Sequence, residues 1–273
     1  MTKQDFITMA VNLMEDFCSV PEDSVLASCG ITRAFDAPLI GIAAADDPLF
    51  EQLKAPQAVG AHYLAPCQWL EGAKSVVSIF VPYSSDVKKA NSCLPKDKIA
   101  PEYVYAKDVV VPYINALVEM LVSAVKAQGY SVVVPSCESE RMKNAVITSD
   151  GSRLKYTSGW SERHAAFVCG LGSFGISGAL ITPKGGAGRF ISLVTDMPLN
   201  ADERPYSHIY EYCTLCGACA VKCPAEAITV ENKKDKAKCS AFVNTTKEKF
   251  APLYGCAKCQ CGVPCANGKP KAE

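Results

Sequence analysis

Four cysteines near the end of the chain constrain its folding more than any other feature. Residues 213 to 224 read CTLCGACAVKCP, a C-x2-C-x2-C-x3-C-P spacing formed by Cys213, Cys216, Cys219 and Cys223. In bacterial ferredoxins with this spacing, three thiolates bind one iron–sulfur cluster and the fourth binds a second cluster. The fourth cysteine therefore needs partners elsewhere, and five cysteines follow it: Cys239, Cys256, Cys259, Cys261 and Cys265. The sequence predicts two [4Fe-4S] clusters.

Other uses of these cysteines fit the spacing less well. Paired C-x2-C units, here Cys213/Cys216 and Cys256/Cys259, are typical of zinc sites, but zinc would leave Cys219 unused at ferredoxin spacing. Disulfide frameworks are typical of short secreted chains, whereas this chain has 273 residues and 15 cysteines. Charged residues interrupt the apolar start, so we expect no secretory leader. We also expect no membrane span and a reducing, cytoplasmic location.

The overall charge balance argues against nucleic acid held by a global electrostatic attraction. Lys and Arg together number 28, as do Asp and Glu, so the formal net charge is zero. There is no global basic field that would attract nucleic acid, although a local basic patch remains open. Hydrophobic residues make up 49% of the chain, which is enough for a sizeable core.

The chain divides into two regions of different composition. Residues 1–200 alternate strand-like and helix-like segments, which predicts an α/β (α+β) domain. Short apolar runs predict strands over four ranges: 39–45, 75–81, 131–135 and 189–195. Helical spacing of apolar residues predicts a helix over 111–129, with Pro112 near its start and Gly129 just beyond its end. The polar segment 200–206 is the predicted boundary, and 201–273 is a cysteine-rich module.

A glycine-rich segment follows a predicted helix at 161–169. Gly170, Gly172 and Gly175 match G-x-G-x-x-G, the fingerprint of dinucleotide sites, and Asp196 follows at a suitable distance. That fingerprint must come after a strand and open a helix, and here a helix runs into the glycines, so a nicotinamide site is not favoured. Two readings stay open: backbone that approaches another ligand closely, or a purely structural loop.

Together these segments resemble a known superfamily. The run CGLGSFGISGALITPKGGAGRFISLVTDMPL (169–199), followed by the ferredoxin motif, is similar to the epoxyqueuosine reductases and reductive dehalogenases. WLEGAKSVVSIFVPYS (69–84) and YGCAKCQ (254–260) extend the resemblance over most of the chain. It implies a nitroreductase-like, cobalamin-binding domain over 1–200 and a ferredoxin-like domain with two [4Fe-4S] clusters over 201–273.

The resemblance also implies the cluster ligands. One cluster would take Cys213, Cys216, Cys219 and a cysteine of the last motif, Cys265 in preference to Cys261. The other would take Cys223, Cys239, Cys256 and Cys259. The last motif departs from the family form, because Val263-Pro264-Cys265 replaces a Cys-Pro pair and Cys261 is additional.

The cofactor and proton-donor residues follow from the same resemblance. The glycine segment would contact the cofactor through Gly170, Gly172, Ser173 and Gly175, with His164 on the preceding helix. Tyr156 occupies the slot in which epoxyqueuosine reductases carry an acidic proton donor and dehalogenases use a phenol. Asp150 is close enough in sequence to compete for that role, and an ordinary half-buried tyrosine is the structural alternative.

The expected function is therefore an oxidoreductase. Electrons from a donor such as ferredoxin or flavodoxin would pass through both clusters to cobalamin, which would reduce a small-molecule substrate. Because the chain ends at 273 without the family's tRNA-gripping extension, tRNA is not expected as a partner. Two alternatives remain: an electron-transfer adaptor without a substrate site, and a flavin-dependent, nitroreductase-like enzyme.

Overall fold

An antiparallel sheet of four strands forms the centre of the computed structural model, which describes residues 1–17 and 19–271. The strand order is β1-β2-β6-β3, and each neighbouring pair is antiparallel. All four predicted strands are present: β1 (Leu39–Ala44), β2 (Ser75–Pro82), β3 (Val132–Val133) and β6 (Gly188–Thr195). The mixed α/β class is confirmed, and the antiparallel pairing makes the domain an α+β fold.

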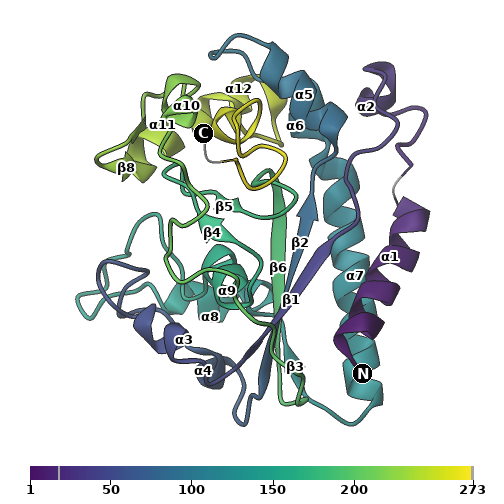
Figure 1. The fold of residues 1–273 in the computed structure, drawn as a ribbon, viewed down its shortest axis with the longest axis vertical. Coiled ribbons are helices and arrows are strands. Elements are labelled where there is room, and N and C mark those ends of the chain that lie inside the picture. The colour runs from purple at the N-terminus through teal and green to yellow at the C-terminus, as the bar shows by residue number, and fades with distance from the viewer. Residues whose placement is uncertain (18, 272–273) are drawn as a thin grey trace.

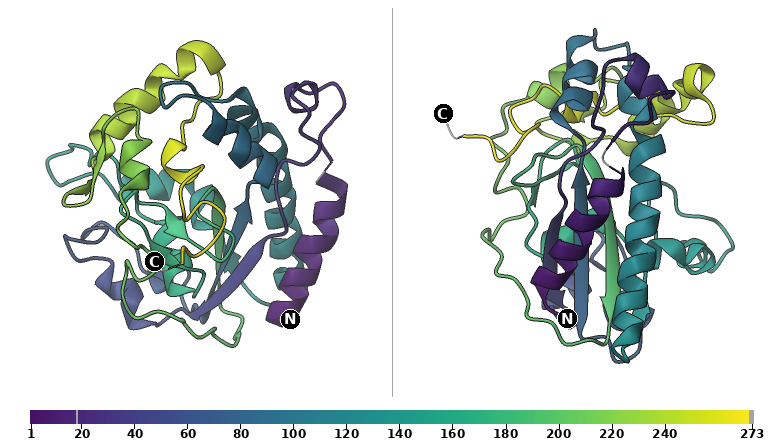
Figure 2. Two further views of the ribbon diagram at one scale, coloured as in Figure 1. Left: turned by 45° about the horizontal axis from the view of Figure 1, so that its top comes forward. Right: turned by 90° about the vertical axis from the view of Figure 1, so that its right-hand side faces the viewer.

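Helices cover both faces of this sheet (Figures 1 and 2). Successive side chains of a strand point to opposite faces, so β2 is buried throughout only because both faces are covered. Val77 and Ile79 pack toward α1 (Lys3–Phe17) and α7 (Lys107–Ala127), and Val76 and Phe80 pack toward α9 (Glu162–Val168). The sheet is therefore the middle of three layers.

Helix α7 begins at Lys107, before the predicted start, so that Pro112 lies inside it. Gly129 follows the helix with φ +83°, the left-handed conformation expected of a residue just past a helix end. By length and composition alone, Pro101–Ala127 is the one helix among the described residues that could cross a membrane. Tyr113, Leu117 and Leu121 are nevertheless fully buried in the larger core, as in a core helix of a folded domain.

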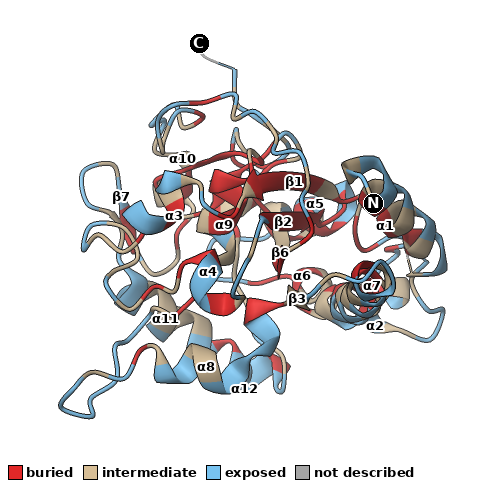
Figure 3. Ribbon diagram, turned by 90° about the horizontal axis from the view of Figure 1, so that it is seen from below, coloured by how far each residue is buried: buried red, intermediate tan, exposed pale blue. Residues whose placement is uncertain are grey.

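Short helices surround the three layers. They are α2 (Val25–Ser28), α3 (Pro48–Gln52), α4 (Pro66–Trp69), α5 (Ser85–Cys93), α6 (Pro101–Tyr105), α8 (Ser139–Asn144) and the 3-10 turn η1 (Pro135–Cys137). Figure 3 shows the buried residues gathered in the sheet and the helices against it, with α8, α11 and α12 largely exposed or half-buried.

The glycine-rich segment folds as a short hairpin between β4 (Ser173–Phe174) and β5 (Leu180–Ile181). A Cβ atom at Gly172 would lie 2.0 Å from the carbonyl oxygen of Ile181, so the two backbones meet where only glycine fits. At Gly170, with φ +81°, a Cβ would lie 3.1 Å from the Glu203 carbonyl oxygen. Both glycines are explained by packing within the protein.

The cysteine-rich module lies at the end of the sheet where β2 ends and β6 begins (Figure 1). It contains α10 (Ala218–Val221), β7 (Ile228–Thr229), β8 (Lys233–Lys234), α11 (Lys236–Thr245), α12 (Lys247–Phe250) and η2 (Lys258–Gln260). The connecting segment packs back on the larger domain: Arg204 pairs with Asp47, and the Tyr206 hydroxyl donates to the Phe167 carbonyl at 2.6 Å. The boundary at residue 200 stays a prediction.

Candidate functional site

Eight of the nine cysteines from 213 onward line two separate cavities. The first cavity contains Cys213, Cys216, Cys219 and Cys265, here called the first quartet. Gly217, with φ +73°, turns the chain into α10, and this helix carries Cys219 inward. The β4–β5 hairpin forms the opposite wall through Gly175, Ile176 and Ser177. None of the described residues that line the first cavity is charged.

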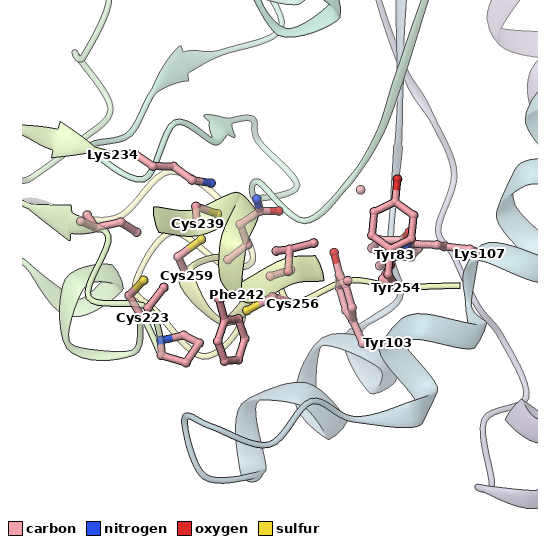
Figure 4. Close-up of a pocket in the computed structure, with 18 of the residues that line it drawn as sticks. Tyr83, Tyr103, Lys107, Cys223, Lys234, Cys239, Phe242, Tyr254, Cys256 and Cys259 are labelled. Carbon is pink, nitrogen blue, oxygen red and sulfur yellow. Dashed lines mark hydrogen bonds between the residues drawn. The ribbon is translucent and has the colours of Figure 1, made fainter. Parts of the chain in front are cut away.

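The second cavity, of about 310 Å3, contains Cys223, Cys239, Cys256 and Cys259, here called the second quartet (Figure 4). These residues come from the end of the ferredoxin motif, from α11 and from the last cysteine motif. The larger domain supplies the other side of this cavity through Tyr83 after β2, Tyr103 on α6 and Arg189 on β6.

Cys261 belongs to neither quartet. Its side chain is fully buried in the core of the larger domain, where the Asn91 amide contacts its sulfur at 3.8 Å. The same amide nitrogen donates to the Cys256 carbonyl at 2.7 Å. The structure therefore places Cys265, and not Cys261, beside Cys213 and Cys216.

Burial makes the quartet thiols hard to ionise on their own. Burial and, to a smaller extent, the neighbouring cysteines together raise the pKa of Cys219 and of Cys256 to about 12. Thiolates at these positions need a cationic partner, which coordinated iron supplies. In the described part of the chain, no three His, Cys, Asp or Glu side chains converge on a single-ion site. In an iron–sulfur cube each thiolate binds a different iron, so the chemistry of both quartets fits a cluster.

The second cavity is strongly cationic. Lys107, Arg163, Arg189 and Lys234 line it, and no Asp or Glu is found among its described lining residues. Burial lowers the pKa of Lys107 to about 8, and Arg189 lowers it further. The Arg189 Nε atom is buried without a hydrogen-bond partner. An outer space of about 480 Å3 shares Lys107, Arg189 and Tyr254 with this cavity and leads to the surface.

Two phenols share this cavity with the cations. Burial raises the pKa of Tyr83, whereas the Arg189 guanidinium lowers it. Burial likewise raises the pKa of Tyr103. Figure 4 shows Tyr83 and Tyr103 on the side of the cavity formed by the larger domain, with the second quartet on the other. Both phenols are protonated at neutral pH and lie on the side away from the cysteines.

The structure places Tyr156 on an exposed loop with φ +59°. Its side chain is 51% exposed, it does not line the second cavity, and its carbonyl accepts from Lys236 at 3.4 Å. Asp150, the competing residue, accepts hydrogen bonds from Thr148 and Ser152 that lower its pKa to about 2. A carboxyl group with that pKa is ionised at neutral pH and has no proton to give.

The predicted cofactor contacts do not form one group. Gly175 lines the first cavity, whereas Ser173 is buried and its Oγ accepts from the Tyr212 backbone NH at 2.7 Å. His164 Nδ1 lies 2.7 Å from Ser161 Oγ, and its ring lies 4.7 Å from that of Phe174. Burial lowers the pKa of His164 to about 4, so it is neutral at pH 7. None of these side chains lines the second cavity.

Sequence reasoning missed the residues that make the second cavity cationic and line it with phenols. Tyr83, Lys107 and Arg189 lie in or beside segments predicted as strand or helix, and nothing in their spacing distinguishes them from ordinary packing residues. Only Arg163 offered a signal, because it adjoins the predicted His164 and precedes the glycine segment.

Comparisons with known proteins agree with this geometry. The family model of the 4Fe-4S binding domain matches residues 206–229, which identifies an iron–sulfur protein. Over 211 residues the chain is 28% identical to an epoxyqueuosine reductase of Leadbetterella byssophila, covering 72% of this chain and 60% of that protein. Over 109 residues it is 35% identical to a tetrachloroethene reductive dehalogenase of Desulfitobacterium hafniense, covering 37% and 20% of the two chains.

Solved structures extend the likeness to the whole fold. An epoxyqueuosine reductase crystallised with an epoxyqueuosine-modified tRNA-Tyr stem loop matches 99% of this chain and 66% of its own, with a TM-score of 0.55 and 18% identity. A catabolic reductive dehalogenase matches 85% and 30%, with a TM-score of 0.53 and 16% identity. The chain is thus a relative of the epoxyqueuosine reductases and reductive dehalogenases, as its sequence resemblance predicts.

One expectation from the sequence is wrong. We expected tRNA to be excluded as a partner, but these relatives are epoxyqueuosine reductases, and one of them was crystallised with a tRNA stem loop. The exclusion relied on where the chain ends. This chain spans about 60% of the length of epoxyqueuosine reductases that it matches over most of its own length, and that shorter span does not argue against tRNA.

Proposed function

We propose that this protein is an iron–sulfur reductase with a [4Fe-4S] cluster in each cysteine quartet and a cobalamin-type cofactor in the outer part of the second cavity. The observation that carries the proposal is the division of eight cysteines into two groups of four. The first quartet would receive electrons and the second would pass them on, because the second shares its cavity with residues of the larger domain. Clusters of this kind supply one-electron transfer.

The residues of the second cavity fit a large cofactor rich in hydrogen-bond acceptors. Lys107, Arg163 and Arg189 supply cationic donors, and the unpartnered Arg189 Nε needs an acceptor. Cobalamin offers amide oxygens and a phosphate, and when bound it supplies the reducing chemistry while the protein supplies position and electrostatics. The two adjoining spaces, of about 310 and 480 Å3, are within the range of cofactor pockets.

The protein must also supply a proton when a substrate is reduced. Tyr156 is the donor proposed from sequence, and its exposed loop would have to close over the cavity to reach a substrate. Tyr83 is a second candidate, because its hydroxyl already lines the cavity beside Arg189. A Tyr156→Phe variant and a Tyr83→Phe variant separate the two, since only loss of the true donor lowers turnover with the cofactor still bound.

We propose that the substrate carries a small reducible group, either free or presented on tRNA. The tRNA-bound relative supports the second form. Helix α11, which supplies Cys239 and Phe242 to the second cavity, also carries Lys236 and Lys238, and Lys247 of α12 lies over the ring of Tyr254, which lines that cavity. Because exposed iron–sulfur clusters persist in reducing surroundings, a cytoplasmic location is part of the proposal.

Anoxic isolation followed by cofactor titration tests the proposal. We expect about eight irons per chain, since two cubes hold four each, and corrin absorption bands that saturate on titration with cobalamin. Flavin bands in place of corrin bands would establish the flavoenzyme alternative. Two clusters with no second cofactor would establish the alternative of an electron-transfer adaptor. An iron content no higher than a single-ion site would hold would refute the proposed iron–sulfur function.

A further inference from the structure

Two lysines of the cysteine motifs contact α5: Lys258 is buried and Lys222 is half-buried. Lys258 is 2% exposed, and its Nζ donates to the carbonyls of Asn91 at 2.5 Å and Leu94 at 3.1 Å. Lys222 Nζ contacts the carbonyl and the hydroxyl of Ser92 at 3.5 and 3.3 Å. Both ammonium groups therefore rest on uncharged oxygen atoms at the C-terminal end of α5.

Neither lysine has a carboxylate close enough for an ion pair among the described residues. Asp97 acts on Lys258 only at longer range. Lys88 of α5 is similar: it is 6% exposed, and its Nζ lies 3.5 Å from the Ala266 carbonyl. Asp36 acts on Lys88 at longer range. Burying a charge is costly unless an opposite charge compensates it, so the buried Lys258 needs an anion nearer than Asp97.

The positions of the lysines in the chain identify that anion. Lys258 lies between Cys256 and Cys259, and Lys222 directly precedes Cys223, so each adjoins ligands of the second quartet. An iron–sulfur cube with four thiolates carries net negative charge. Arg163 and Lys234 face the same quartet from inside the cavity. The first quartet has no such surroundings, because no described residue that lines its cavity is charged.

We propose that Lys258 and Lys222 raise the reduction potential of the cluster at the second quartet above that of the cluster at the first. Reduction adds one negative charge to a cluster, and fixed nearby cations stabilise the reduced form. One electron leaves the reduced first cluster and is accepted by the oxidised second, while an external low-potential one-electron reductant restores the first. The inference rests on the proposed function only in requiring both clusters.

A purely structural role makes a different prediction. Cations near the C-terminal end of a helix stabilise it through the exposed carbonyl groups, so Lys258 and Lys222 could serve only to dock α5. In that case their removal would lower the stability of the protein and leave both potentials unchanged. The potential is therefore the measurement that separates the two roles.

The test is a redox titration of the anoxically reconstituted full chain, followed by electron paramagnetic resonance. We compare wild type with Lys258→Met, Lys222→Met and the charge-conserving Lys258→Arg. Lys249→Met is the matched control, since Lys249 lies on α12 over the Phe250 ring and contacts neither quartet. Cys216→Ser and Cys256→Ser variants assign each signal to its quartet.

In wild type we expect the second-quartet signal to have the higher potential. Lys258→Met should lower it by about 59 mV, the equivalent of a tenfold change in a one-electron equilibrium constant. Lys222→Met should lower it less, and Lys258→Arg and Lys249→Met should leave it near wild type. If Lys258→Met does not retain its iron, the Lys222→Met result decides.

Three results would overturn the inference: unchanged potentials in iron-replete Lys258→Met or Lys222→Met, an equal shift in both clusters, or a wild-type first cluster with the higher potential. Iron far below eight atoms in wild type would instead refute the proposed function, so the two failures can be told apart.

Discussion

The two cysteine quartets lie in one small module, yet their surroundings differ sharply. The first quartet faces a hairpin of the glycine-rich segment, and no charged residue lines its cavity. The second faces the end of the central sheet, where Lys107, Arg163 and Arg189 gather beside Tyr83 and Tyr103. The same ligand chemistry is thus placed in an uncharged pocket on one side and a cationic one on the other. The comparison teaches that the surrounding residues, and not the cysteine spacing, make the two quartets differ.

The largest effect should come from removing one ligand of each quartet. Cys216→Ser and Cys259→Ser should each lose about half of the iron, because each cube needs four thiolates. Only Cys259→Ser should also abolish electron transfer into the second cavity with the first cluster still present. Cys261→Ser is the control and should keep all of the iron, since Cys261 lines neither cavity. Iron loss in Cys261→Ser would contradict the assignment of the cluster ligands to these two quartets.

The glycine-rich wall of the first cavity gives the next effect. Gly172→Ala should lower the free energy of unfolding by about 3 kcal/mol, because its Cβ would meet the Ile181 carbonyl at 2.0 Å and the hairpin must shift. Gly175→Ala should cost less than about 1 kcal/mol, since its Cβ would meet only side chains, Ile181 at 3.3 Å and Ser177 at 3.7 Å. Chemical denaturation measures both. Equal costs would contradict the packing explanation of Gly172.

The cationic wall of the second cavity gives a smaller effect. Arg189→Leu should weaken cobalamin binding about tenfold, or about 1.4 kcal/mol, because an acceptor on the cofactor loses the Nε–H donor of Arg189. Absorbance titration measures the affinity, and iron content should not change. Arg33→Leu, which removes a surface arginine paired with Asp36, is the matched control. If both variants bind cobalamin as wild type does, the cofactor does not reach Arg189.

The smallest effect is a pH dependence confined to the second cavity. Burial lowers the pKa of Lys107 to about 8, so its positive charge is present at pH 7 and is lost as the pH rises through 8. Cobalamin affinity should therefore fall only about threefold between pH 7 and 9. Lys107→Met should flatten this profile. A wild-type profile that is already flat would remove Lys107 from the cofactor contacts.

The elements that the sequence predicted well are those with strong local signals. The short apolar, Val- and Ile-rich runs of β2 and β6 predict strands whatever their partners, and the antiparallel pairing emerges only from the fold. Pro112 misled the start of α7: it lies in the second turn, where a proline removes one backbone hydrogen bond, and the buried face of the helix offsets that cost. For the glycine segment the sequence left two readings open, close approach to a ligand or a structural loop, and at Gly172 the structure shows close approach to the backbone of β5.

Sequence by itself determined the cluster chemistry, since the spacing of Cys213, Cys216, Cys219 and Cys223 along the chain limits which metal groups these thiolates can hold. The resemblance already favoured Cys265 over Cys261 for the first quartet. Tertiary structure alone decided that Cys261 enters the core, and that Lys258, between two cysteines of the second quartet, is buried against α5. The physical reason is that the two properties depend on residues at different separations along the sequence. Ligand spacing is a local property of the backbone, whereas the charge and solvent around a cluster come from residues far apart in sequence that only packing brings together.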